Sequence, residues 1–265
     1  MTKHTIRDIF ITLVSVLGIS FLYRTYMRRK GPLVRVLCFH DVDDAVWFES
    51  VIKMLLQNHN VLTPYQFHAN DFDVEKINIL LSFDDGYQSW IDTCLPVLER
   101  YDCKGLFFIN SGLLDSVGDL EQVDAYMQNR LRISSKSPLT WQGAEALLVS
   151  GHSIGGHTIT HPDLTSLPEE EVCTEVQDDK RRAESMLAVE LKDFAYPFGT
   201  QLHYNDSIAK TATVAGYQYI YTAETGFYDN NITSVPRTLV EHNQVMSSLC
   251  HWIEGGYDIF RALKI

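Results

Sequence analysis

Short apolar segments alternate with helical stretches along most of this 265-residue chain. Segments 34–39, 77–83 and 105–110 have the length and composition of buried β-strands, whereas 47–58 and 89–101 have helical patterns. Strands separated by helices pair in parallel, because each helix returns the chain to the same edge of the sheet. The alternation therefore predicts an α/β fold with a largely parallel sheet or barrel.

The second half of the chain continues the alternation. Helices are expected at 141–149, at 208–215 and from 246 onward, and strands at 194–196 and 217–222. Ser166 and Glu169 match a capping box, which predicts the start of a further helix. Residues 112–139 are predicted to form a long polar connection with one short helix, and such connections are often functional.

The segment Ile9–Tyr23 is apolar apart from Thr12, Ser15 and Ser20, and basic residues follow it. Extended to Thr5–Met27, it reaches the roughly 20 residues that span a bilayer. We therefore expect a single-pass membrane anchor with a basic flank at 1–30 and one domain at 31–265. The excess of Lys and Arg after the segment favours a cytoplasmic domain. An amphipathic segment lying in the membrane interface is the alternative.

Charge and cysteine content limit the partners of the domain. The formal net charge is -12, and Lys and Arg cluster only beside the N-terminal segment, so nucleic acid is not expected as a partner. The five cysteines lack the spacing of a zinc site and are odd in number, which favours free thiols in a reducing compartment. Nothing in the sequence sets the oligomeric state.

Two adjacent carboxylates follow the predicted strand 77–83. They are Asp84 and Asp85, and Gly86 after them permits a sharp turn. One carboxylate can bind a hard cation while the other takes a proton from the water that the cation activates. An Asp-Asp-Gly turn on the surface is the more common origin of such a tripeptide, so the motif needs further support.

His157 and His161 are spaced so that both imidazoles can reach one ion from a single turn of chain. Two imidazoles and one carboxylate leave positions open on a metal, which is the composition of a catalytic site. Two unrelated polar histidines are the alternative for this spacing alone.

Three motifs in succession resemble those of the polysaccharide deacetylase family, also called the NodB-homology or carbohydrate esterase 4 family. The motifs occupy 82–86, 151–162 and 194–199, and the resemblance extends over 33–242. It implies a distorted (β/α) barrel of about seven strands. It also implies metal-dependent removal of N-acetyl or O-acetyl groups.

Matched by position, Asp84 resembles the general base of the family. Asp85, His157 and His161 resemble the ligands of a divalent ion, for which we expect Zn²⁺. A backbone N–H near Phe198 is expected to stabilise the tetrahedral oxyanion.

The general acid is the least defined part of the resemblance. His242, in the sequence Leu-Val-Glu-His, loosely fits the late motif of the family. His40, at the end of the first strand, is the other candidate, because it would lie at the same end of the barrel. The sequence leaves both open.

One position departs from the family pattern. Phe194 stands where many members carry the arginine that holds the catalytic aspartate. Arg237, in a Val-Pro-Arg sequence, is the candidate to replace it from a later strand. Without a replacement, Asp84 would lack its charged partner and its orientation.

The expected substrate is an N-acetylated amino sugar, and the anchor favours a membrane-associated or lipid-linked glycan. Tyr196, Pro197 and Phe198 are expected to border the pocket, and Trp141 is a candidate for stacking on a sugar ring, with core packing as its alternative role. Two other functions stay open: a catalytically impaired carbohydrate-binding protein of the same fold, and a metal-dependent amide hydrolase acting on a non-sugar substrate.

Overall fold

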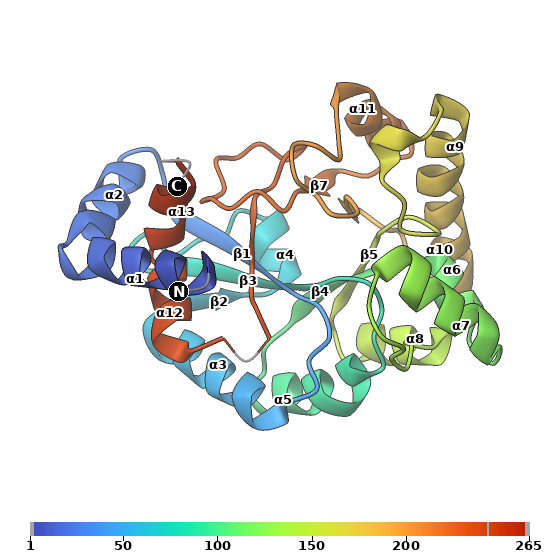
Figure 1. Ribbon diagram of the computed structural model, residues 1–265, viewed down its shortest axis with the longest axis horizontal. Helices are drawn as coiled ribbons and strands as arrows, with labels where there is room; N and C mark the ends of the chain where they lie inside the picture. Colours follow the sequence, from blue (N-terminus) through green and yellow to red (C-terminus); the bar gives the residue numbers. More distant parts are fainter. Residues whose placement is uncertain (1–2, 243, 263–265) are drawn as a thin grey trace.

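The computed structural model describes residues 3–242 and 244–262. Its strands are β1 (Leu33–Phe39), β2 (Asn60–Leu62), β3 (Ile77–Phe83), β4 (Gly105–Ile109), β5 (Ser153–Gly156), β6 (Asp193–Ala195), β7 (Tyr219–Tyr221) and β8 (Arg237–Leu239). They form one sheet in the order β7-β6-β5-β4-β3-β1-β8, with β2 paired to β3 beside this path (Figure 1). Every pairing between these strands is parallel, as the sequence predicts.

The sheet curves until its two ends nearly meet. At one end of the path, β8 pairs with β1, and at the other end Tyr221 in β7 forms a parallel bridge with Val235. Val235 lies two residues before β8, so this bridge brings the ends together. The fold is a nearly closed parallel α/β barrel of seven strands, and the expected barrel is confirmed.

Helices cover the outside of the barrel. They are α3 (Ala45–Asn58), α4 (Pro64–His68), α5 (Leu95–Arg100), α6 (Ser111–Asp115), α7 (Leu120–Tyr126), α8 (Trp141–Val149), α9 (Glu169–Cys173), α10 (Asp179–Leu187), α11 (Asp206–Val214), α12 (Met246–Ile253) and α13 (Gly256–Ala262). Three π-helical turns, η1 (Trp90–Cys94), η2 (Met127–Leu131) and η4 (Thr174–Asp178), and one 3₁₀ turn, η3 (Leu164–Ser166), adjoin them.

Both faces of the central strands are buried, which explains their continuous apolar sequences. Residues Val34, Val36 and Leu80 belong to a cluster inside the barrel, whereas Leu33 and Leu37 belong to the larger cluster between the sheet and the outer helices. This alternation follows from the two-residue period of a strand. The filled interior leaves chemistry to the carboxyl ends of the strands.

The prediction of one continuous membrane-anchor helix over the N-terminal apolar segment is wrong. Helix α1 (Lys3–Val16) ends before Gly18, which adopts the left-handed conformation with φ 74° at the N-cap of α2 (Ile19–Arg28). No helix in the described part of the chain is by itself long and apolar enough to cross a membrane. Ile9–Val16 and Ile19–Arg28 reach that length and composition only together, bent by 71°.

Two further expectations are corrected. Residues 112–139 hold most of α6, all of α7 and the turn η2, instead of one short helix, and the Asp119 carboxylate caps α7 by accepting from two backbone N–H groups. Ser166 does not form the expected capping box, because its hydroxyl donates to the Asp163 carbonyl and α9 begins after Pro168.

Candidate metal centre and active site

Side chains at the carboxyl ends of β1, β3 and β5, together with Arg237 at the start of β8, line one pocket of about 800 Å³. Asp84 and Asp85 follow β3, His157 and His161 follow β5, and Arg237 begins β8. The pocket therefore gathers residues that are far apart in the sequence, at the end of the barrel where parallel α/β folds place their ligands.

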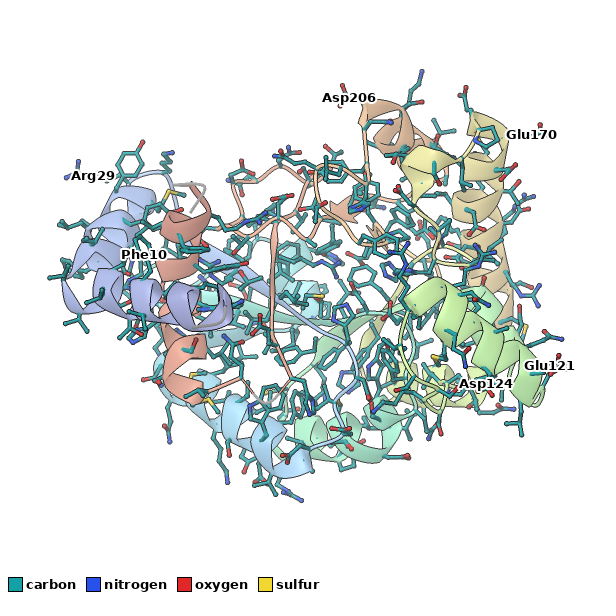
Figure 2. The ribbon with its side chains drawn as sticks, viewed as in Figure 1. Phe10, Arg29, Glu121, Asp124, Glu170 and Asp206 are labelled. Carbon is teal, nitrogen blue, oxygen red and sulfur yellow. The ribbon has the colours of Figure 1, made fainter. Side chains whose placement is uncertain are left out.

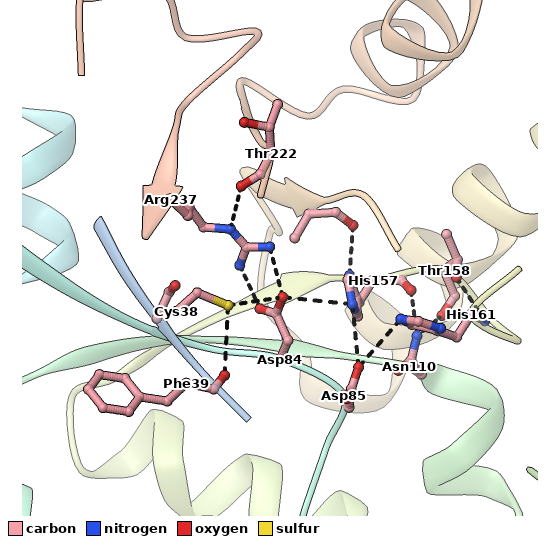
Figure 3. A network of polar contacts seen from close by, with 12 residues as sticks. Cys38, Phe39, Asp84, Asp85, Asn110, His157, Thr158, His161, Thr222 and Arg237 are labelled. Atoms are coloured by element: carbon pink, nitrogen blue, oxygen red, sulfur yellow. Dashed lines mark hydrogen bonds and ion pairs between the residues drawn. The ribbon is translucent and has the colours of Figure 1, made fainter. Parts of the chain in front are cut away.

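Three of these residues converge on one point (Figure 3). The Oδ1 atom of Asp85 lies 3.5 Å from the Nε2 atoms of both His157 and His161. All three side chains are buried, and their ligand atoms lie within 4.8 Å of one another. Asp85 Oδ1 has no hydrogen-bond partner among the described residues, although a buried carboxylate oxygen normally has one. A divalent cation would satisfy all three atoms, so the residues fit a metal ion with two imidazole ligands and one carboxylate.

Neighbouring groups fix the orientation of these ligand atoms. The Tyr87 hydroxyl donates to Asp85 Oδ2 at 2.9 Å, which leaves Oδ1 to face the histidines. The Nδ1–H of His157 donates to the Ala195 carbonyl at 2.7 Å. This bond selects the tautomer whose Nε2 carries a free lone pair toward Asp85.

The backbone that carries the ligands is held in uncommon conformations. Asp85, Thr158 and His161 have φ values of 86°, 71° and 52°, in the left-handed region that costs energy for residues with a Cβ. The His161 N–H donates to the Thr158 hydroxyl at 3.0 Å, and the Asn110 side-chain amide donates to the carbonyls of His157 and Thr158 (Figure 3). These bonds hold the turn that brings both imidazoles to Asp85.

Burial and charge set the ionisation of the two histidines. Burial lowers the pKa of His161 to about 4, so its imidazole is neutral at pH 7, as a metal ligand must be. Burial also opposes the charge of His157, but the carboxylates of Asp84 and Asp85 outweigh it and raise its pKa above the ordinary value. A cation bound at Asp85 would compete with that proton.

Asp84 forms a buried, bidentate ion pair with Arg237. The two guanidinium nitrogens lie 2.6 and 2.7 Å from its carboxylate oxygens, and the Arg237 Nε–H donates to the Thr222 carbonyl at 2.9 Å. Burial disfavours the charged carboxylate, but Arg237, His157 and His40 together outweigh burial, so the pKa of Asp84 lies below its ordinary value. Phe194 is buried against Tyr196 in the core, and the charged partner of Asp84 comes from β8 instead.

His40 and His242 both line the pocket. His40 is half-buried and follows β1, whereas the His242 side chain is 49% exposed and follows β8. The Nε2 atom of His242 lies 3.5 Å from Asp43 Oδ1, and its ring lies 6.2 Å from that of Trp47. The structure thus brings both candidates for the general acid to the pocket.

Two of the four residues expected at the substrate lie in the pocket wall. Tyr196 and Phe198 line it, and the Phe198 ring lies 4.8 Å from the His161 ring. Pro197 and Trp141 are not among the lining residues. Trp141 starts α8, where its indole N–H donates to Asp115 at 3.0 Å, and its stacking on a sugar stays a prediction.

Other pocket residues have no signal in the sequence. Trp47 lines the wall beside His242, and Lys136, from the segment after η2, forms ion pairs of 2.8 Å with Asp41 and 3.4 Å with Asp43. These contacts arise from how the connection 112–139 folds back over β1. No short sequence motif predicts these contacts. Only the length of the connection 112–139 suggested a functional role.

Comparisons with known proteins agree with this geometry. The family model described as polysaccharide deacetylase matches residues 72–220. The Bacillus subtilis protein YxkH is 28% identical over 183 residues, which cover 68% of this chain and 58% of YxkH. The peptidoglycan-N-acetylglucosamine deacetylase of Bacillus cereus is 28% identical over 147 residues, 55% of this chain and 56% of that protein. The chain thus spans little more than half the length of these two curated relatives.

Solved structures share the fold. The Streptococcus pyogenes deacetylase PplD in complex with acetate aligns with a TM-score of 0.66 at 20% identity, over 84% of this chain and 97% of that one. IcaB from Ammonifex degensii aligns with a TM-score of 0.68 at 21% identity, over 84% and 98%. A de-N-acetylase from Aggregatibacter actinomycetemcomitans aligns with a TM-score of 0.69 at 17% identity, over 83% and 99%.

Proposed function

We propose, since the chain belongs to the polysaccharide deacetylase family, that it is a metal-dependent hydrolase that removes the N-acetyl group of an amino sugar. The observation that carries the proposal is the unpartnered Asp85 Oδ1 between two histidine Nε2 atoms, with the ionised Asp84 beside them in the same pocket. The similarity to the peptidoglycan-N-acetylglucosamine deacetylase of Bacillus cereus supports an N-acetylated amino sugar as substrate.

Asp85, His157 and His161 would hold the divalent ion, Zn²⁺ in our proposal. When bound, the ion would polarise the amide carbonyl and lower the pKa of a water molecule. Asp84 accepts a proton from the attacking water, and Arg237 keeps that carboxylate ionised and oriented through both of its oxygens. A backbone N–H near Phe198 donates to the oxyanion that forms from the carbonyl.

The departing amine needs a proton, which we assign to His242. His242 lines the pocket, and its Nε2 atom lies 3.5 Å from Asp43 Oδ1. His40 is the competing group. His242→Gln and His40→Gln separate the two, because loss of the acid lowers kcat and removes the basic limb of the pH–rate profile.

Aromatic and charged residues of the pocket suit a sugar. Trp47, Tyr196 and Phe198 offer flat apolar surfaces for a pyranose face, and Asp43 and Lys136 offer charged groups for its hydroxyls. The apolar N-terminal helix pair supports the further proposal that residues 1–30 associate with a membrane and that the glycan is membrane-borne or lipid-linked.

The test is acetate release by the full chain from N-acetylglucosamine oligosaccharides, peptidoglycan and a lipid-linked N-acetyl amino sugar, with a small acetamide as the non-sugar comparison. We expect release from a sugar substrate, its loss after chelation, and its return when Zn²⁺ is added back. Release that survives complete metal removal, or that occurs only with the non-sugar amide, would contradict the proposal. The Asp84–Arg237 ion pair supports turnover over the carbohydrate-binding alternative, because Asp84 has a charged partner although Phe194 stands at the usual arginine position.

A further inference from the structure

The N-terminal helix pair is folded onto the C-terminal helices and does not project from the domain. Figure 1 shows α1 and α2 beside α12 and α13 at one end of the molecule. Ile11 and Val14 of α1 are buried, and the Phe10 and Phe260 rings lie 5.5 Å apart. A Cβ at Gly256 would lie 2.8 Å from the Ile11 side chain, so this contact needs a glycine.

Ion pairs also hold this face of the helix pair against the C-terminal part of the domain. Arg7 forms two hydrogen bonds of 2.7 and 3.0 Å with Glu241, and its guanidinium lies 4.6 Å from the Trp252 ring centroid. Arg24 bonds both the carboxylate and the carbonyl of Glu254 at 3.0 Å. A helix α1 that crossed a bilayer would have to give up the Arg7 contacts and carry that charge away from its partner.

The opposite face of the pair is apolar and exposed. On α1, Ile9, Leu13 and Val16 lie at spacings of four and three residues, which puts them on one side of the helix. On α2, Ile19, Leu22 and Tyr26 form the same kind of stripe, and the exposed fractions of all six range from 41% to 76%. One side of the pair thus packs on the protein, and the other offers apolar side chains to a partner.

The basic residues beside the apolar stripe indicate which partner it binds. Arg28, Arg29 and Lys30 follow the stripe without interruption and are exposed, and Figure 2 shows Arg29 at the outer end of the pair. Such a basic group stands out on a chain with a net charge of -12. Apolar side chains bordered by Arg and Lys match the interface of a bilayer that contains anionic phospholipid.

Helices α1 and α2 are each too short to cross a bilayer. With 14 and 10 residues, α1 and α2 are about 21 and 15 Å long at 1.5 Å per residue. The hydrocarbon core of a bilayer is about 30 Å thick, and the 71° bend between the helices prevents them from acting as one rod.

We propose that α1 and α2 form an in-plane docking surface for an anionic phospholipid bilayer, with the stripe inserted at the level of the headgroups and neither helix spanning. The inference rests on the membrane association proposed above and specifies its form. Glu241, the partner of Arg7, also lines the catalytic pocket, so α1 reaches the pocket rim through Arg7. Docking therefore brings a membrane-borne sugar to the site.

The test is flotation of the full-length chain with vesicles of phosphatidylcholine alone or mixed with phosphatidylglycerol. We expect binding to the mixed vesicles, weakened by high salt, and release of the bound protein by alkaline carbonate. Leu13→Ser with Leu22→Ser should reduce partitioning roughly tenfold or more, because two exposed leucines lose their lipid contact. Val149→Ser with Val214→Ser, which removes two exposed apolar side chains elsewhere, is the matched control and should bind normally.

Acetate release from a soluble oligosaccharide, unchanged in the Leu13/Leu22 variant, shows that the variant is folded and separates this inference from the proposed reaction. Resistance to carbonate extraction would overturn the in-plane form while leaving membrane association intact. No binding to either vesicle would overturn both. A dimer in solution that the Leu13/Leu22 variant dissociates, without vesicle binding, would assign the stripe to a second copy of the chain.

Discussion

Replacing Arg237 by Met tests how the general base is held. The substitution removes the guanidinium that contacts both oxygens of Asp84 and leaves a carboxylate in a site that is almost fully buried. Met occupies a similar length of space without the charge, so the change acts mainly through Asp84. The ligands Asp85 and His157 keep their own partners, Tyr87 and the Ala195 carbonyl.

Removing one partner of a buried ion pair costs about 3 to 5 kcal/mol of folding free energy. The pKa of Asp84 now lies below its ordinary value because Arg237, together with His157 and His40, outweighs burial. Without Arg237, burial dominates, so the pKa rises and the acid limb of the kcat–pH profile moves to higher pH. At neutral pH we expect kcat to fall by about 10²- to 10⁴-fold, the contribution of a general base.

The assays are urea unfolding, the pH–rate profile and metal content, with two matched variants. Arg237→Lys keeps the charge but loses the bidentate geometry, so it should retain more stability than Arg237→Met and recover little kcat. Adding Asp84→Asn to Arg237→Met removes the unpaired charge and should restore stability without activity. If the double variant is as unstable as the single one, the buried-charge argument is wrong.

Three other changes have expected outcomes. Tyr87→Phe removes the hydrogen bond to the metal-ligand carboxylate and should weaken zinc affinity about 10- to 100-fold in chelator competition; unchanged affinity would contradict the orienting role. Burial lowers the pKa of His152 to about 4, below its unfolded value, so the unfolded state binds the proton first and stability should fall by about 2 to 3 kcal/mol between pH 6.5 and 4. His152→Gln should flatten that dependence in urea unfolding, and an unaltered slope would count against it. Gly156→Ala drives a Cβ into the Tyr217 hydroxyl and should cost about 1 to 3 kcal/mol, whereas Gly226→Ala, 3.6 Å from its nearest neighbour, should cost little in the same assay.

The sequence located the strands that carry the site. The predicted segments 34–39, 77–83 and 105–110 are strands β1, β3 and β4 within one residue at each end. They were recognisable because each is a short apolar run that stops at polar residues, and a fully buried parallel strand needs such a run. The short strand β2 escaped prediction, because three residues are too few to show a pattern.

Contacts that depend on packing could not be predicted. Tyr87 reaches Asp85 because Asp85 and Gly86 turn the chain with positive φ values, and no motif in the sequence indicates that contact. Trp141 sits outside the pocket because α8 packs on the outer side of the barrel. Gly18 breaks the N-terminal helix, although an isolated glycine in an apolar run is also tolerated inside helices.

The central claim is that Asp84 acts on a substrate at a metal ion held by Asp85, His157 and His161. The most direct measurement compares metal content and acetate release in the same preparations of wild type, Asp84→Asn and His157→Ala. We expect Asp84→Asn to retain the metal and lose acetate release, and His157→Ala to lose both. Full acetate release by metal-loaded Asp84→Asn, or by metal-free His157→Ala, would contradict the account.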